Sequence, residues 1–280
     1  MSSHWYLRGR LFDAKHPEWD TLEPWPLTKA GTRKKRIGWH DRIAAGLKPS
    51  VTTWLQAIKG DSVDGLMAFS AKLGRDIGIS EIIKLELEVL QDTDPQTLVD
   101  TFWAEYRKRR DEYSETGTRM HKVIEEYVQR KDIIDLSGSE ATAAENAFIF
   151  LEANDLIDGG AAEYVVEGPD YAGTVDWHVP GRQCIVDWKT IRDEEGKPVR
   201  KPYPSELAQV AAYWHALHPE PFRDEYVGTR YPACNVYISQ RTGDILRTQL
   251  WSKNDIERGF KLFTLAQAVT RNLKMIEGTF

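Results

Sequence analysis

Hydrophobic periodicity changes along the chain near residue 160. Before that point apolar residues recur at helical spacing, and after it segments rich in Val, Ile, Tyr and Trp alternate with turn signals. The expected helices cover residues 50–59, 79–91, 95–112, 117–130 and 139–155, and the expected strands cover 161–167, 171–179 and 183–190. A helix at 204–218, strands at 233–240 and 244–251, and a final helix at 253–275 complete the order. Residues 1–48 show no regular pattern.

This order of elements predicts the fold class. Helices followed by three strands, a helix, two strands and a helix are typical of an α/β fold with a mixed central sheet flanked by helices. The 280 residues suffice for one large domain or for a core with an accessory lobe. We expect a mainly helical N-terminal region at 1–110 and a core at 111–280.

The expected strands at 171–179 and 183–190 bring charged residues together. Alternate side chains of a strand share a face, so Asp187 and Lys189 point the same way. A turn at Gly181-Arg182 pairs Asp176 directly with Asp187, whereas a turn at Pro180-Gly181 shifts the pairing by two residues. Both registers place Asp176, Asp187 and Lys189 on one face, within about 5–8 Å of each other.

These three side chains suit metal-assisted phosphodiester hydrolysis. Two opposed carboxylates resist joint ionisation unless a cation lies between them, and their oxygens suit Mg²⁺ or Mn²⁺, as one ion or two. The Lys189 ammonium can hold or help to deprotonate an attacking water and can offset charge that grows on a phosphate. The alternative is an exposed Asp–Lys ladder, which fits poorly because the flanking strands are too apolar for an edge hairpin.

Two helices carry polar residues beside apolar faces. In the helix at 117–130, with Thr118 as its expected N-cap, His121 lies at the edge of the apolar stripe and Glu125 lies one turn further on. A neutral imidazole at such a border can ligate a metal, or it can be an ordinary hydrogen-bonded histidine. In the helix at 204–218, Ser205, Gln209 and Tyr213 form a narrow polar seam that needs partners, either at a site or within the core.

Composition bears on the partners, the cofactors and the cellular location to be expected. The formal net charge of −6 argues weakly against a nucleic-acid partner, but a local basic track exists at Arg33, Lys34, Lys35, Arg36 and Arg42, with Trp39 and His40 among them; a solvated loop explains it equally well. The two cysteines, Cys184 and Cys234, are too few for an iron–sulfur cluster, and we expect buried thiols. Apolar runs are shorter than a membrane span and residues 1–20 lack a secretion signal, so we expect a cytoplasmic protein, in a bacterial or phage-infected cell, without a membrane partner.

Together these residues resemble the RecB-like branch of the PD-(D/E)XK nucleases. That branch has Gly-x-x-x-His, Gly-Thr-x-Asp, (Asp/Glu)-x-Lys-Thr and Gln-x-x-x-Tyr in this order. Here they are Gly117–His121, Gly173–Asp176, Asp187–Thr190 and Gln209–Tyr213. Residues 49–55, Pro-Ser-Val-Thr-Thr-Trp-Leu, are similar to an early segment of phage and mitochondrial single-chain exonucleases.

The resemblance implies roles for these residues. His121, Asp176, Asp187 and the backbone carbonyl of Trp188 would ligate Mg²⁺ or Mn²⁺, Lys189 would be catalytic, and Gln209 and Tyr213 would brace the site or contact DNA. Glu125, Glu163 and Thr190 would have supporting roles. Arg119, residues 33–36 of the basic track and the region 1–110 are the candidates for gripping DNA.

The function implied is a metal-dependent deoxyribonuclease that leaves 5′-phosphates. Analogy with single-chain relatives favours an exonuclease acting on single- or double-stranded ends in recombination, repair or phage DNA processing, with a recombination or annealing protein as a candidate partner. No Gly-x-x-x-x-Gly-Lys-(Ser/Thr) loop is present, so no nucleotide cofactor is expected. The alternatives are a structure-specific or restriction-type endonuclease, a catalytically inactive DNA-binding accessory protein, and an unrelated α/β protein with an incidental Asp-x-Lys.

Overall fold

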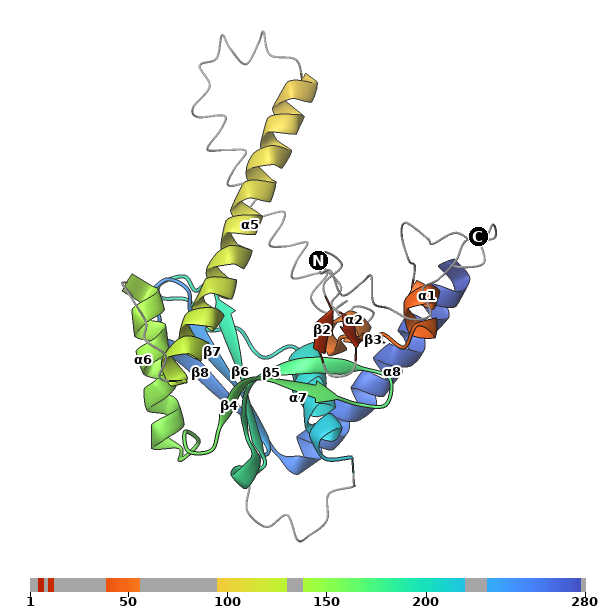
Figure 1. The fold of residues 1–280 in the computed structure, drawn as a ribbon. Helices are drawn as coiled ribbons and strands as arrows, with labels where there is room; N and C mark the ends of the chain where they lie inside the picture. The colour runs from red at the N-terminus through yellow and green to blue at the C-terminus, as the bar shows by residue number, and fades with distance from the viewer. Residues whose placement is uncertain are drawn as a thin grey trace, which may run out of the picture.

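The computed structural model describes residues 5–7, 10–12, 39–55, 95–129, 138–219 and 231–277, and its centre is a five-stranded sheet (Figure 1). The strand order is β4-β5-β6-β7-β8, with bounds β4 Ala161–Glu167, β5 Ala172–Val179, β6 Cys184–Ile191, β7 Ala233–Ser239 and β8 Ile245–Trp251. Strands β6 and β7 run parallel and the other neighbours run antiparallel. The mixed sheet and the α/β class predicted from the sequence are therefore confirmed.

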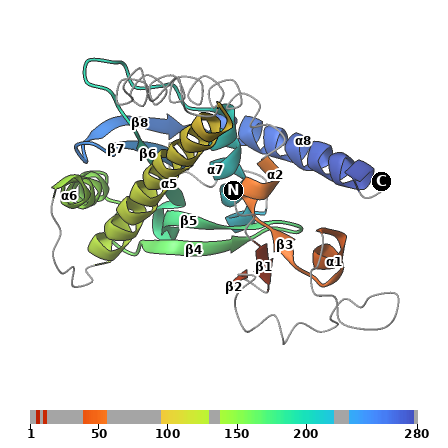
Figure 2. The ribbon, with the colours of Figure 1, turned by 90° about the horizontal axis from the view of Figure 1, so that it is seen from above.

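Helices cover both faces of this sheet (Figures 1 and 2). Helices α5 (Pro95–Val128) and α6 (Gly138–Ala153) pack on one face through Met120, Ile124 and Leu151, against Val186 and Trp188 of β6. Helices α7 (Pro204–Leu217) and α8 (Lys253–Glu277) pack together over the other face, where Ile185 is buried. The alternation along β6 thus turns Ile185 towards α7 and its neighbours towards α5.

Helix α5 differs from the two helices expected at 95–112 and 117–130. It is one helix from Pro95 to Val128, so the N-cap predicted at Thr118 is wrong. Gly117 and Thr118 are tolerated in the interior because Gly117 packs closely against β6, and because the hydroxyl of Thr118 donates to the carbonyl of Ser114, 3.0 Å away. The boundary expected near residue 110 falls inside this helix.

The expectation of an irregular segment at 1–48 is wrong for its described parts. Strands β1 (Trp5–Leu7), β2 (Arg10–Phe12) and β3 (Lys48–Pro49) form a small sheet, and α1 spans Trp39–Ala44. Helix α2 (Val51–Trp54) has Ser50 as its N-cap and joins the α7–α8 core through Trp54. The sequence did not predict these strands because three residues are too few to show the alternation of apolar and polar positions that marks a strand. The helix expected at 79–91 lies outside the described residues.

The β5–β6 connection decides the hairpin register. Residues Pro180–Arg182 form a 3₁₀ turn, and Gln183 adopts a left-handed conformation at φ 47°. Val179 then pairs with Cys184, and Trp177 with Val186. This is the register of the Gly181-Arg182 alternative, although the loop itself is longer than two residues.

Two further expectations concern the whole chain. Cys184 and Cys234 are buried free thiols, as predicted, and burial raises the pKa of Cys184 to about 12. In the part of the chain that the structure describes, none of the helices combines the length and the apolar character needed to cross a membrane.

The α7–α8 contact provides a stability prediction. A Cβ at Gly259 of α8 would lie 2.8 Å from both the Cβ of Ala211 and the carbonyl oxygen of Leu207. Alanine is favoured over glycine inside a helix by about 1 kcal/mol, but overpacking costs about 1–3 kcal/mol. Because the crowded carbonyl is backbone and cannot swing away, we expect Gly259→Ala to lower Tm by several degrees in thermal denaturation; an unchanged or raised Tm would contradict the close packing.

Candidate active site

The candidate site begins where β5 and β6 separate. Their ladder ends at the pair Trp177–Val186, and continuing its register by one residue would place Asp176 opposite Asp187. At this point Oδ2 of Asp176 accepts a hydrogen bond of 2.7 Å from the backbone N–H of Trp188. The carboxylate therefore fills the gap between the strands, and the peptide of Trp188 meets the site through its N–H group.

A second group of side chains lies on the α7 face of β6. Nζ of Lys189 is 2.6 Å from Oδ2 of Asp187, and the two side chains share one face as the alternation predicts. Lys189 also donates to Oε1 of Gln209 at 3.1 Å, and Nε2 of Gln209 donates to the hydroxyl of Tyr213 at 3.0 Å. The polar seam of α7 thus has its partners, and its first partner is the lysine.

Helix α5 contributes His121. Its Nδ1 lies 3.6 Å from Oδ2 of Asp176, and its side chain is 31% exposed. Burial lowers the pKa of His121, with Lys189 acting in the same direction and Asp176 against it. The neutral imidazole favoured in this way is the form that can ligate a cation.

Two glycines permit the close contacts that assemble these elements. A Cβ at Gly117 would lie 2.9 Å from Oγ1 of Thr190, so the missing side chain lets α5 approach β6. A Cβ at Gly173 would lie 2.3 Å from a ring carbon of Tyr213, so β5 accepts the tyrosine only because residue 173 is glycine. The glycines four residues before His121 and three before Asp176 therefore have a packing reason.

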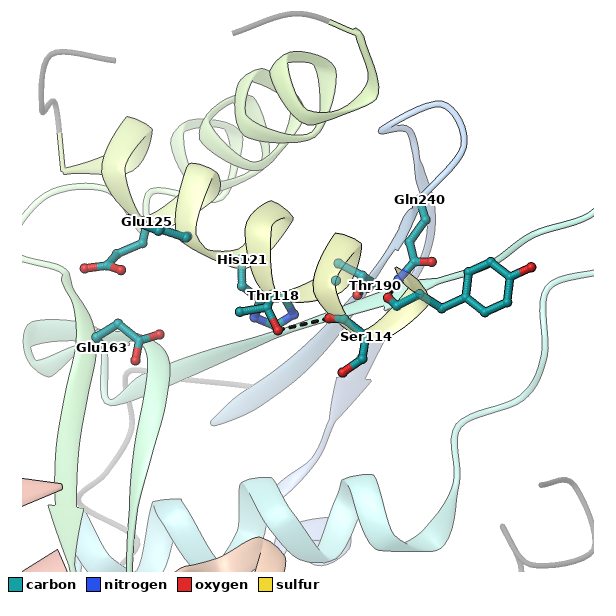
Figure 3. Close-up of a pocket in the computed structure, with 10 residues that line it drawn as sticks. Ser114, Thr118, His121, Glu125, Glu163, Thr190 and Gln240 are labelled. Carbon is teal, nitrogen blue, oxygen red and sulfur yellow. Dashed lines mark hydrogen bonds between the residues drawn. The ribbon is translucent and has the colours of Figure 1, made fainter. Parts of the chain in front are cut away.

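A cavity of about 620 Å³ opens beside these residues, between α5, β4 and the ends of β6 and β7. His121, Glu125, Glu163, Thr190 and Gln240 line it, and Figure 3 shows the carboxylates of Glu125 and Glu163 facing the same space. The remaining lining residues are Tyr113, Ser114, Gly117, Thr118 and Lys122. The supporting residues predicted from the sequence thus border one cavity with His121.

Negative charge accumulates at this place. Burial, helped by Asp176 and Glu125, raises the pKa of Glu163 to about 7. Glu163 also has a left-handed backbone, φ 48°, between the pairs Ala162–Trp177 and Tyr164–Val175. This conformation is unfavourable for a residue with a side chain, and such outliers concentrate at functional sites.

Asp187 and Lys189 perturb each other in the interior. Burial raises the pKa of Asp187 to about 7, and Asp176 adds to this while Lys189 opposes it. Burial acts to lower the pKa of Lys189, but the carboxylates of Asp187 and Asp176 outweigh it and raise that pKa. Lys189 is thus held as an ammonium ion and supplies the positive charge next to Asp187.

Sequence reasoning missed several residues behind the site. Asn235 of β7 donates to Oδ2 of Asp187 at 2.6 Å. Glu206, in the first turn of α7, pairs with Arg200 at 2.6 Å and accepts a hydrogen bond from Tyr237 at 2.7 Å, which anchors the start of that helix. An asparagine inside an otherwise apolar strand and a glutamate in an apolar helix were the available signals.

None of the candidate DNA-binding residues that the structure describes lines the cavity. Residues 33–36 are not among the described residues. Arg119 is exposed and pairs with Glu140 of α6 at 3.0 Å, and it does not line the cavity. Arg42 lies over the ring of Trp5, 5.0 Å from its centroid.

The donor set fits a hard divalent cation in its chemistry. It consists of carboxylate oxygens and one imidazole nitrogen, in a place where burial, together with the charge of Asp176, raises the pKa values of Glu163 and Asp187. Within the described ranges, however, no three His, Cys, Asp or Glu side chains form a ready-made ligand group. Nδ1 of His121 lies 3.6 Å from Oδ2 of Asp176, while Oδ2 of Asp187 is occupied by Lys189 and Asn235.

No protein-family model matches the chain, and comparison with curated proteins finds no match.

Proposed function

We propose that this protein is a Mg²⁺- or Mn²⁺-dependent deoxyribonuclease with a PD-(D/E)XK core of the RecB-like branch. The carrying observation is that four short motifs, spread over residues 117–213, meet in one continuous set of contacts. His121 contacts Asp176, Asp176 accepts from Trp188, and Lys189 joins Asp187 to Gln209. Tyr213 then packs closely against Gly173, the first residue of the Gly173–Asp176 motif.

The residues of this set would have different roles in phosphodiester hydrolysis. His121, Asp176 and Asp187 would hold the cation, which when bound supplies an activated water and offsets negative charge on the phosphate. The ammonium of Lys189 adds a positive charge close to the same carboxylate and can orient the water. Gln209 holds that ammonium in place, and Tyr213 holds Gln209.

The cavity beside His121 is the proposed entry for DNA. Lys122 of α5 lines it, and the side chain of Lys122 is 71% exposed. Exonuclease action on DNA ends rests on the resemblance to single-chain exonucleases. A structure-specific or restriction-type endonuclease and an inactive DNA-binding accessory protein remain the competing functions.

The function is tested by digestion of end-labelled DNA. Single- and double-stranded substrates, each labelled at the 5′ or the 3′ end, and closed circular DNA are incubated with Mg²⁺ or Mn²⁺ and with EDTA. We expect metal-dependent release of nucleotides from ends and no cutting of circles. Cutting of circles favours an endonuclease, binding without cleavage in Mn²⁺ favours the accessory protein, and no DNA binding at low salt points to an unrelated α/β protein.

The positions of two basic residues of α5 lead to a binding prediction. Lys122 lines the cavity and lies 3.9 Å from Oε1 of Glu126 on the next turn, whereas Arg119 pairs with Glu140 at 3.0 Å and does not line the cavity. We expect Lys122→Ala to weaken DNA binding and to reduce the slope of log affinity against log salt by about one, because one phosphate contact is lost. Arg119→Ala serves as the matched comparison and should change the slope less; fluorescence anisotropy at several salt concentrations measures both. An equal or larger effect at Arg119 would place the DNA on the α6 side instead.

A further inference from the structure

The centre of β7 carries a polar side chain where an apolar one would be expected. All seven residues of this strand are buried, and Asn235 is 0% exposed. Asn235 is the parallel partner of Asp187 in β6, so the two side chains are neighbours on the same face of the sheet. A buried amide is unfavourable unless both its carbonyl and its NH₂ group find partners.

Both ends of this amide are hydrogen-bonded to side chains. Nδ2 of Asn235 donates to Oδ2 of Asp187 at 2.6 Å, and Nε1 of Trp251, at the end of β8, donates to Oδ1 of Asn235 at 2.6 Å. An indole N–H can only donate, and an ionised carboxylate can only accept. The amide therefore has one favourable orientation, which the indole fixes from the side away from the site.

The fixed amide of Asn235 in turn holds the carboxylate of Asp187. Its Oδ2 receives hydrogen bonds from Asn235 and from Lys189, on two sides. Asn235 does not depend on the lysine, because its own anchor is Trp251 in another strand. If Lys189 moves towards a substrate phosphate, Asn235 still holds the same oxygen.

We propose that Asn235, locked by Trp251, is a positioning residue that fixes the Asp187 carboxylate for metal binding. This inference rests on the proposed nuclease function. Groups behind a ligand orient it and tune its affinity, and losing one commonly costs about tenfold to a hundredfold in metal affinity or activity. A merely structural asparagine would instead affect stability and leave metal affinity unchanged.

The test uses Asn235→Leu, Trp251→Phe and the double variant in the full chain. Leucine keeps the approximate volume and removes the amide, whereas phenylalanine removes the indole donor and leaves Asn235 in place. We expect the Kd for Mn²⁺, measured by calorimetry, to rise about tenfold in Asn235→Leu. We also expect kcat for DNA cleavage to fall about tenfold with KM for DNA unchanged, and smaller changes of the same kind in Trp251→Phe.

The double variant and a remote control separate positioning from stability. Because the Trp251 indole acts through the Asn235 amide, the Kd for Mn²⁺ and kcat of the double variant should equal those of Asn235→Leu alone. Thr270→Val is the control, since it also removes a buried hydrogen bond, from the Thr270 hydroxyl to the carbonyl of Trp54 at 3.0 Å, and it lies on α8. It should lower Tm without changing Mn²⁺ affinity or kcat.

The outcomes distinguish this inference from the proposed function. A wild-type protein that neither binds Mn²⁺ nor cleaves DNA overturns the function, and the positioning role with it. A wild-type protein that does both, with Mn²⁺ affinity and kcat in Asn235→Leu within about twofold of wild type, overturns only the positioning role. Should Asn235→Leu fail to fold, Trp251→Phe decides by the same comparison. In the wild type we expect the indole N–H of Trp251 to exchange slowly with solvent, and fast exchange would contradict its hydrogen bond to Asn235.

Discussion

Replacing Asp187 by alanine is expected to reduce DNA cleavage by at least about a thousandfold, the loss typical of removing a major stabiliser of the transition state. Asp187 is 2% exposed and lies between Lys189 and Asn235. Its carboxylate is the proposed cation ligand that contacts Lys189, the proposed catalytic lysine. The variant therefore loses both the ligand and the group that holds the ammonium. Mn²⁺ binding should weaken together with cleavage.

The measurement is single-turnover digestion of labelled DNA, with calorimetry for Mn²⁺. Asp187→Asn is made beside Asp187→Ala because it keeps the volume of the side chain and guards against an unfolded variant. Asp170→Ala is the matched control: Asp170 pairs with Arg271 and accepts from Gln267 at the α8 side of the molecule, away from the cavity beside His121. Cleavage retained in Asp187→Ala, with folding intact, would exclude this assignment of the site.

Lys189→Ala is expected to slow turnover by at least about a hundredfold while Mn²⁺ still binds. The Lys189 ammonium donates to Asp187 and Gln209 and is not itself a ligand, so its loss removes charge stabilisation without removing a donor to the metal. The same change leaves the buried Asp187 carboxylate without its counter-ion. Breaking a buried ion pair from one side costs about 3 kcal/mol or more, although Asn235 remains as a hydrogen-bond donor.

The lost positive charge of Lys189 should be replaceable by a bound metal ion. Without metal, Lys189→Ala should have a lower Tm than the wild type, and saturating Mn²⁺ should raise its Tm by more than it raises that of the wild type, because the cation replaces the lost positive charge. Lys48→Ala is the control, since it breaks the 2.7 Å Lys48–Glu167 pair outside the site. Loss of Mn²⁺ binding in Lys189→Ala would mean that the lysine organises the metal site rather than acting in turnover.

Much of the core was predictable because its signals are local. The strand at 161–167 matches β4, and the strands at 233–240 and 244–251 match β7 and β8 to within a residue at each end. Alternation along β6 was enough to place Asp187 and Lys189 on one face. The helix boundary predicted at Gly117 and Thr118 was wrong because it, too, rested on a local signal. Both residues have low helix propensity, and the packing of Gly117 against β6 becomes visible only in the tertiary structure, where α5 continues through them.

The sequence by itself determined the periodicities, and through them the class of fold, the strand faces and the motif residues that could share a site. Only the tertiary structure decided that α5 is one helix, that the Gly181-Arg182 register holds, and that Asn235, 48 residues from Asp187, is its hydrogen-bond partner. The reason is physical. Period and propensity are set by neighbours a few residues apart, whereas the partner of a buried polar group is set by which distant strand the sheet order places beside it.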